Sequence, residues 1–309
     1  MILLYLIIAF RKYGKRRFDG SPSLPYFTSS SLGIEEEPFS FCSGKYKLSG
    51  SRYYVRKDAY KGLVVFFHGI GAGRNAYLKE ISLLAKEGYL VYAYDNLGCM
   101  QSEGVGYVSL GHLPIDEKAF FRYLETDAKA KGLKRYAMGH SWGGYASLCA
   151  LKDEYKIEKV ISVAGFIRPT EIIKTNVKDL NNPYLRWLSK YAYRIAFGRK
   201  QDIDALTFLK NTSKPVLYIQ GSKDSIVPFA LNGQYLKKEV GNKENIEFFF
   251  VEGSEHEPLF TRKAEEYTNS FIYRNSHKKV DEKIEHMDIK KAREINPFVW
   301  KRVIDFLKE

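Results

Sequence analysis

Three residues in the chain have the types that nucleophilic catalysis requires. Ser141 lies in the stretch GHSWGG (139–144), after a run that predicts a strand and before a run that predicts a helix. A serine hydroxyl is a weak nucleophile unless a base takes its proton and a third group orients that base. His256 follows another predicted strand and is our candidate base. His140 adjoins Ser141 and is too close along the chain to reach it, and His68 stands beside glycines, where we expect it to shape a turn.

The candidate orienting acid is Asp224, in the stretch GSKDSIVP (221–228) after a further predicted strand. The same stretch has good turn chemistry, so a purely structural aspartate stays open as an alternative. Glu252 and Glu255 are alternative acids, although both are very near His256 in the sequence. The chain order Ser141, Asp224, His256 is the order expected when the nucleophile stands on a strand–turn–helix elbow.

Acyl transfer also needs backbone N–H groups that stabilise a developing oxyanion. One should be the N–H of Trp142, the residue after the candidate nucleophile. The second should come from the loop HGIGAG (68–73), where glycines let the backbone approach a substrate. Ile70 is our candidate for this second donor, with Gly71 as the next choice.

The elements that must position these residues alternate along the chain. Continuous apolar runs predict buried strands, and runs with apolar residues three and four apart predict helices between them. This rhythm predicts an α/β fold with a mostly parallel central sheet flanked by helices, whose active site lies at the carboxyl ends of the strands. The predicted strands are 39–42, 53–56, 62–67, 89–94, 135–138, 159–166, 214–220 and 245–251, and a last helix begins with Asn296 as N-cap and Pro297 at its first position.

Residues 167–213 interrupt the rhythm, because they contain no strand pattern. Their aromatic residues recur at helical spacing, and we predict a helical lid inserted after the strand 159–166, with Tyr184, Trp187 and Tyr191 as substrate contacts. An extra helical layer without function is the alternative. A second irregular stretch, 259–294, is polar and predicts a solvated helical insertion.

The N-terminal segment differs from the rest. Residues 1–10 are apolar, residues 11–17 are basic, and a Ser- and Pro-rich linker follows, so we divide the chain into a segment 1–34 and a domain 35–309. Three interpretations stay open for residues 1–17: an anchor on a membrane surface, the tail of a longer membrane segment, or a helix packed on the domain.

Composition narrows the class of protein. The chain has 309 residues with 49 Lys and Arg against 36 Asp and Glu, a net charge of +13. The basic residues are scattered and no nucleic-acid-binding motif is present, so we expect no nucleic-acid partner. Three widely spaced cysteines form no disulfide framework and no CxxC metal site, which favours a cytoplasmic protein, either free or attached to the inner face of the membrane.

The combined motifs resemble the α/β-hydrolase superfamily, in the branch of serine aminopeptidase-like, monoacylglycerol lipase-like and esterase members. The resemblance rests on HGIGAG (68–73), DNLGCMQSEG (95–104), GHSWGG (139–144), GSKDSIVP (221–228) and GSEH (253–256). It implies the α/β-hydrolase fold, a triad of Ser141, Asp224 and His256, and oxyanion donors at Ile70 and Trp142. The sequence departs from the family pattern at Met100, where many relatives carry glycine.

We therefore predict a serine hydrolase that cleaves a carboxylic ester (EC 3.1.1) through an acyl-enzyme, with a small-molecule ester or acyl substrate and with neither cofactor nor metal. The alternatives are an aminopeptidase or amidase with the same triad, an acyltransferase, and a non-catalytic binding module on the same fold. The sequence does not indicate an oligomeric state.

Overall fold

The computed structural model describes residues 1–20, 26–57, 59–71, 73–176, 182–241, 243–276 and 287–309. Its centre is an eight-stranded sheet in the order β1-β2-β4-β3-β5-β6-β7-β8. β1 and β2 form an antiparallel hairpin, β2 pairs antiparallel with β4, and the other neighbours are parallel. The strands are β1 (Glu35–Ser43), β2 (Tyr46–Tyr54), β3 (Leu63–Phe67), β4 (Leu90–Tyr94), β5 (Arg135–His140), β6 (Ile157–Val163), β7 (Val216–Gly221) and β8 (Ile246–Val251).

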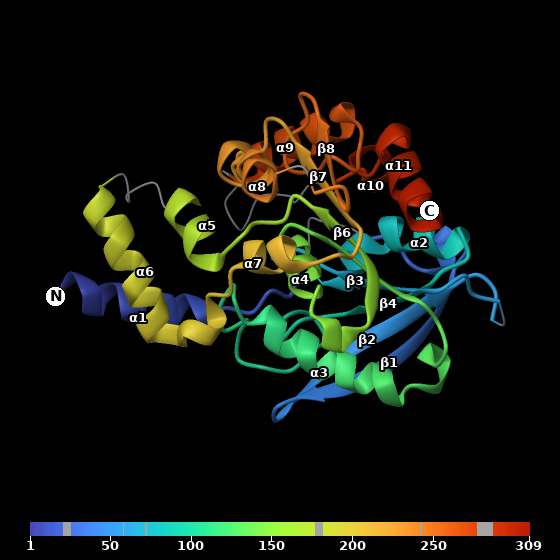
Figure 1. Cartoon of the computed structure of the whole chain (residues 1–309), viewed down its shortest axis with the longest axis horizontal. Helices are drawn as coiled ribbons and strands as arrows, with labels where there is room; N and C mark the ends of the chain where they lie inside the picture. The colour runs from blue at the N-terminus through green and yellow to red at the C-terminus, as the bar shows by residue number, and fades with distance from the viewer. Residues whose placement is uncertain (21–25, 58, 72, 177–181, 242, 277–286) are drawn as a thin grey trace.

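The sheet is covered by helices on both faces (Figure 1). On one face, α2 (Leu78–Lys86) and α11 (Pro297–Lys308) share a single apolar core with alternate residues of the strands. On the other face, α3 (Leu113–Thr126), α4 (Trp142–Cys149), α7 (Ala205–Asn211) and α8 (Gly233–Val240) share a larger core. Both faces are therefore buried, and this explains why β3 and β4 are continuous apolar runs.

The predicted mostly parallel sheet is confirmed, and each predicted strand corresponds to an observed one. β1 and β2 are longer than predicted, because β1 begins with exposed glutamates that break the apolar pattern. The N-cap of α11 is as predicted: the Asn296 side chain accepts hydrogen bonds from the N–H groups of Phe298 and Val299. None of the helices within the described residues combines the length and apolarity needed to cross a membrane.

Residues 167–213 form α5 (Pro169–Asn176), α6 (Pro183–Phe197) and α7, joined in part by residues 177–181, which lie outside the described residues. The N-terminal helix α1 (Ile2–Gly14) packs along α6. In Figure 1 the two helices lie together on the left of the sheet, on the side away from the C-terminus. Residues 21–25 of the predicted linker are also outside the described residues, and α9 (Arg262–Ser276) and α10 (Ile289–Ala292) follow β8.

Candidate active site

Ser141 stands on a sharp turn between β5 and α4. Its backbone has φ 57° and ψ −114°, a conformation that residues with a side chain rarely adopt. A Cβ at Gly139 would collide with the carbonyl oxygen of Gly143, and a Cβ at Gly143 would collide with that of Phe67. The two glycines therefore let strand, turn and helix approach closely enough to place the serine at the start of α4, where the helix dipole favours negative charge.

The structure brings Ser141, His256 and Asp224 together from the ends of three strands. The Nε2 atom of His256 lies 2.9 Å from the Oγ atom of Ser141. The Nδ1 atom of His256 lies 3.0 Å from each carboxylate oxygen of Asp224. Because Asp224 accepts at Nδ1, that nitrogen carries the proton, and Nε2 of the neutral ring is free to accept the serine proton.

The carboxylate of Asp224 is buried and held from three sides. One oxygen accepts the N–H groups of Ile226 and Val227, at 3.0 and 2.9 Å, as an aspartate in a turn does. The other accepts the side-chain amide of Gln220 at 3.1 Å. The turn aspartate and the orienting acid are thus the same residue, and Gln220, which no sequence motif marked, contributes to its position.

The pKa of His256 lies above its ordinary value. Burial of the imidazole lowers it, but the hydrogen bond and the negative charge of Asp224 more than offset this effect. The alternative acids Glu252 and Glu255 are both exposed. The carboxylate of Glu255 accepts a hydrogen bond from Asn269, so it points away from the imidazole that Asp224 holds.

His140 does not contact Ser141, but it supports the loop that carries His256. Its Nε2 atom lies 2.9 Å from the carbonyl oxygen of His256 and its Nδ1 atom 3.0 Å from the hydroxyl of Tyr77. A carbonyl can only accept, so Nε2 carries the proton and the Tyr77 hydroxyl donates to Nδ1. The same hydroxyl accepts the N–H of Gly69 at 3.0 Å.

These contacts form one chain of hydrogen bonds between the two loops of the site. It runs from the N–H of Gly69, through Tyr77 and His140, to the backbone of His256. Burial lowers the pKa of His140, so the ring stays neutral, as this arrangement requires. His68 joins its own loop to the loop after β4: its Nδ1 donates to the Gly69 carbonyl and its Nε2 accepts from Asn96.

Glu265 of α9 holds the His256 loop from the other side. Its carboxylate accepts hydrogen bonds from the Ser254 hydroxyl at 2.8 Å and from the N–H groups of Glu255 and Glu257 at 3.1 and 2.8 Å. The bonded residues lie on both sides of His256, so the carboxylate fixes the whole turn. The stretch 259–294, predicted to be solvated, thus contributes a buried contact to the site.

A cavity of about 380 Å³ opens beside Ser141, within the usual size of ligand pockets. Ile70, Trp142 and Ser141 line it together. Trp142 is the first residue of α4, so its N–H has no helical carbonyl to bond. The remaining lining is apolar or aromatic: Phe10, Tyr13, Tyr107, Leu110, Phe166, Ile172, Ile173, Phe197, Ile226 and Val227.

The predicted lid contacts lie elsewhere. Tyr184, Trp187 and Tyr191 are on an exposed face of α6, and they are not among the residues that line the cavity. The cavity wall instead includes Phe10 and Tyr13 of the N-terminal helix, which no motif in the sequence had marked. Among the described residues, no cluster of three or more His, Cys, Asp and Glu side chains could hold a metal ion.

The comparisons with known proteins agree with this architecture. A family model described as serine aminopeptidase, S33, matches residues 58–211, which include Ser141 and the loop of Ile70 but stop before Asp224 and His256. An esterase from Pyrococcus furiosus superposes with a TM-score of 0.63 at 20% identity, over 84% of this chain and 98% of the esterase. The chain belongs to the α/β-hydrolase superfamily.

Other superfamily members share only part of their length with this α/β-hydrolase. An acylaminoacyl peptidase from Pyrococcus horikoshii superposes with a TM-score of 0.58 at 18% identity, over 84% of this chain and 44% of the peptidase. A puromycin-hydrolyzing peptidase from Mycobacterium tuberculosis gives a TM-score of 0.54 at 20% identity, over 72% and 36%. No curated protein matches the sequence. Likenesses at this level establish the fold, and the predicted α/β-hydrolase fold is confirmed.

Proposed function

We propose that this α/β-hydrolase cleaves carboxylic esters through an acyl-enzyme on Ser141. The observation that carries the proposal is the unbroken hydrogen-bond path from Asp224 through His256 to Ser141, beside an apolar cavity. A serine with a neutral histidine at its hydroxyl and a buried carboxylate behind the ring is equipped for nucleophilic attack on a carbonyl.

The steps follow from the positions of these atoms. Nε2 of His256 takes the proton of Ser141 as Oγ attacks the ester carbonyl, and the N–H groups of Ile70 and Trp142 stabilise the oxyanion. His256 then gives the proton to the leaving alcohol, which leaves an acyl group on Oγ. A water, deprotonated by the same nitrogen, releases the acid. Asp224 keeps the ring oriented and stabilises its charged form.

The charge around the cavity favours an ester or acyl group over a peptide with a free amino terminus. Among the described residues that line the cavity beside Ser141, none has a charged side chain. The lid acids that could grip an ammonium group lie elsewhere: Asp202 is paired with Arg194 and also accepts from Thr170.

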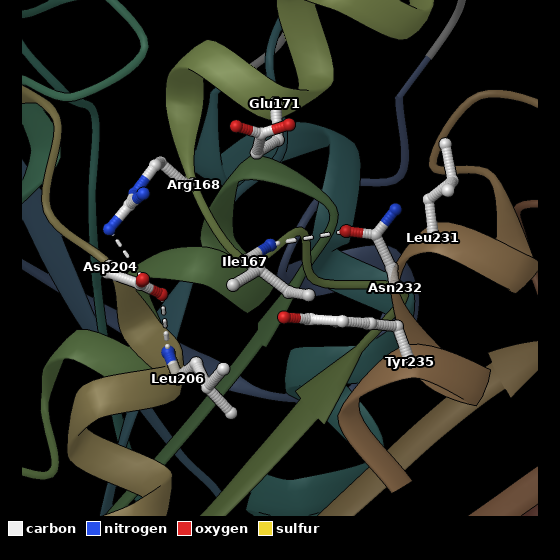
Figure 2. Close-up of a pocket in the computed structure, with 8 residues that line it drawn as sticks. All are labelled: Ile167, Arg168, Glu171, Asp204, Leu206, Leu231, Asn232 and Tyr235. Atoms are coloured by element: carbon white, nitrogen blue, oxygen red, sulfur yellow. Dashed lines mark hydrogen bonds and ion pairs between the residues drawn. The ribbon is translucent and has the colours of Figure 1, made fainter. Parts of the chain in front are cut away.

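Glu171 and Asp204 line a second cavity of about 370 Å³, where Asp204 pairs with Arg168 (Figure 2). Asn232 and Tyr235 form the opposite wall of this second cavity, and Ser141 is not among its lining residues. An amino terminus held by these acids would therefore not be held in the cavity that Ser141 lines.

Amide cleavage is the second candidate, because the matching family model describes serine aminopeptidases and acylaminoacyl peptidases are among the superposed structures. An N-acylated peptide carries no charge at its blocked end and would suit the same apolar cavity. An acyltransferase and a non-catalytic binding module are distinguished from both by the experiment below.

The test is labelling of the purified protein with a fluorophosphonate, followed by turnover of p-nitrophenyl esters of increasing chain length. Free and N-acylated aminoacyl anilides form the second substrate panel. Ser141→Ala should abolish labelling, whereas Ser147→Ala, which removes a buried serine hydroxyl of the same helix, should not. We expect faster turnover of esters than of anilides, and the preferred length of the acyl chain then reports which chains the cavity accepts.

Each other outcome selects a different function. Faster turnover of N-acylated anilides than of esters would replace the esterase proposal with the peptidase one. Labelling with acyl transfer to an added alcohol in preference to water would indicate an acyltransferase. If the folded protein shows neither labelling nor turnover, the non-catalytic binding module is the remaining function.

A further inference from the structure

The helices α1 and α6 form one unit beside the cavity, which we call the α1–α6 pair. Phe10 of α1 packs against Tyr193 and Phe197 of α6, with ring centroids 5.8 and 6.5 Å apart. Phe10 and Tyr13 from α1 and Phe197 from α6 all belong to the cavity wall. A partner bound to the outer side of the α1–α6 pair would therefore lie next to the proposed substrate site.

The position of α1 is fixed by the residues that follow it. The N–H of Val108 bonds the carbonyl of Gly14, and Phe18 pairs with Cys99 in a short parallel bridge. The Arg17 guanidinium donates to three backbone carbonyls of the loop 100–104. A Cβ at Gly14 would collide with the carbonyl oxygen of Val108, so the end of α1 is fitted closely to the backbone at Val108.

The outer side of the α1–α6 pair is apolar and aromatic. On α6, a stripe at positions i, i+3, i+7 and i+11 is about half exposed, and its rings contact one another. The ring centroid of Trp187 lies 4.4 Å from that of Tyr191, in a tilted arrangement, and 6.2 Å from that of Tyr184, in a stacked one. We call this set, completed by Ile195, the aromatic stripe. On α1, the exposed apolar and aromatic residues are Ile2, Leu4, Tyr5, Ile8 and Tyr13.

This surface is unusual for a helix pair in water. α1 is apolar on both its faces over its first two turns, whereas a helix on the surface of a domain normally has a polar side. Exposed apolar patches that adjoin a ligand site mark interaction surfaces. Tyrosine and tryptophan are the residues that favour the boundary between water and lipid.

The charge of the α1–α6 pair is of one sign. Neither helix contains an aspartate or glutamate, whereas α1 ends in Arg11 and Lys12 and the exposed Lys15 and Arg16 follow. Four basic side chains next to an apolar surface complement the headgroups of anionic lipid. A second copy of the chain would bring the same positive charges against one another, which disfavours self-association through this surface.

We propose that the α1–α6 pair binds the surface of a bilayer that contains anionic phospholipid. The aromatic stripe and the first two turns of α1 enter the headgroup boundary, and the basic residues contact the phosphates. If the proposed function holds, acyl substrates then pass from the lipid into a cavity whose wall is part of the same two helices. This assigns Tyr184, Trp187 and Tyr191 to lipid contact instead of the predicted substrate contact.

Tryptophan fluorescence reports this binding directly. The chain has three tryptophans, of which Trp142 and Trp300 are buried and Trp187 is 52% exposed. Vesicles of phosphatidylcholine with phosphatidylglycerol should shift the emission to shorter wavelength, and the protein should sediment with them. Trp187→Phe should keep the sedimentation and lose most of the shift.

The surface variants give the magnitudes. Neutralising Arg11 and Lys12 to Gln should lower partitioning onto the anionic vesicles about 25-fold, at about fivefold per charge near the surface. Trp187→Ser with Tyr191→Ser should lower it further. The matched control is Phe298→Ser, which removes an exposed ring from α11 and should leave partitioning unchanged.

Three results would overturn the proposal. One is the absence of sedimentation with anionic vesicles by folded protein. Another is equal loss of partitioning in the Phe298→Ser control. The third is a dimer in solution that Trp187→Ser dissociates, which would make the surface an interface between two copies. Binding is measured on Ser141→Ala as well, so that a failure of lipid binding and a failure of catalysis remain distinct.

Discussion

The hydroxyl of Tyr77 is the group whose removal tests the coupling between the two loops of the site. Tyr77→Phe leaves the ring in place and removes one oxygen. Two buried groups then lose their partner: the N–H of Gly69 and the Nδ1 atom of His140. Each unsatisfied buried group costs about 1–3 kcal/mol, so the loss of two partners should lower the free energy of unfolding by about 2–6 kcal/mol.

Tyr94 provides a matched control for this substitution. Its ring is buried in the sheet, but within the described part of the chain its hydroxyl has no hydrogen-bond partner. Tyr94→Phe therefore removes the same atom without breaking a hydrogen bond, and it should leave the free energy of unfolding within about 0.5 kcal/mol of the wild type or raise it.

The assay is urea unfolding of the three proteins at one pH, followed by circular dichroism. The kinetic counterpart is kcat on the best ester. Gly69 precedes Ile70, so loosening its peptide should lower kcat in Tyr77→Phe and spare it in Tyr94→Phe. Equal stability of the two variants would refute the hydrogen-bond chain through Tyr77, because both lose the same hydroxyl.

Three further predictions concern single carboxylates. Asp224→Asn should lower kcat about 10⁴-fold. Because Asp224 raises the pKa of His256 and the base must be neutral to act, the same variant should move the acid limb of the pH–rate profile to lower pH. An acid limb at the same pH as in the wild type would contradict this role of Asp224. Glu265→Gln should lower kcat about 10- to 100-fold by loosening the turn that carries His256. The control is Glu266→Gln, at the exposed neighbouring residue, which should leave kcat unchanged. Equal effects of the two substitutions on kcat would show that Glu265 does not hold this turn. Burial raises the pKa of Glu117 to about 8. Between about pH 4.5 and pH 8 this carboxyl therefore stays protonated in the folded chain but ionises in the unfolded chain. The free energy of unfolding of the wild type falls across this range, because ionisation stabilises only the unfolded chain. Glu117→Met should therefore gain stability relative to the wild type over that range, by up to about 4 kcal/mol at pH 8; parallel pH profiles in denaturant unfolding would exclude the effect.

The sheet could be predicted from the sequence because its inner strands are buried on both faces and read as continuous apolar runs. The residues that follow those runs meet at one edge, which is why Ser141, Asp224 and His256 could be named before their distances were known. The lengths of β1 and β2 could not be predicted, because their exposed positions carry glutamate and lysine as a loop would.

The helix α6 shows where periodicity stops being informative. Its aromatic spacing correctly indicated a helix, but an apolar stripe is normally taken as the buried face. Here Leu188, Ala192 and Tyr193 face the interior, and the aromatic stripe faces outward. Spacing defines a face of a helix without stating what covers it.

Contacts between distant segments were also beyond prediction. Phe10 enters the cavity wall because α1 packs on a helix far along the chain. Tyr77 and Glu265 act through hydrogen bonds to loops that only the folded chain brings near. Neither residue belongs to a local motif, so no sequence signal could have selected it.

The packing of α1 on α6 sets an order of events during synthesis. α1 leaves the ribosome before α6, which begins about 170 residues later, and this separation corresponds to about 8 to 35 s at the usual rates of translation. During that interval the apolar face of α1 that packs on α6 in the folded chain lacks this partner, although the loop residues Tyr107 and Val108 that contact its last turn are already made. Side chains of both helices line the cavity beside Ser141, so its wall is completed only after α6 has been made, long after the synthesis of α1.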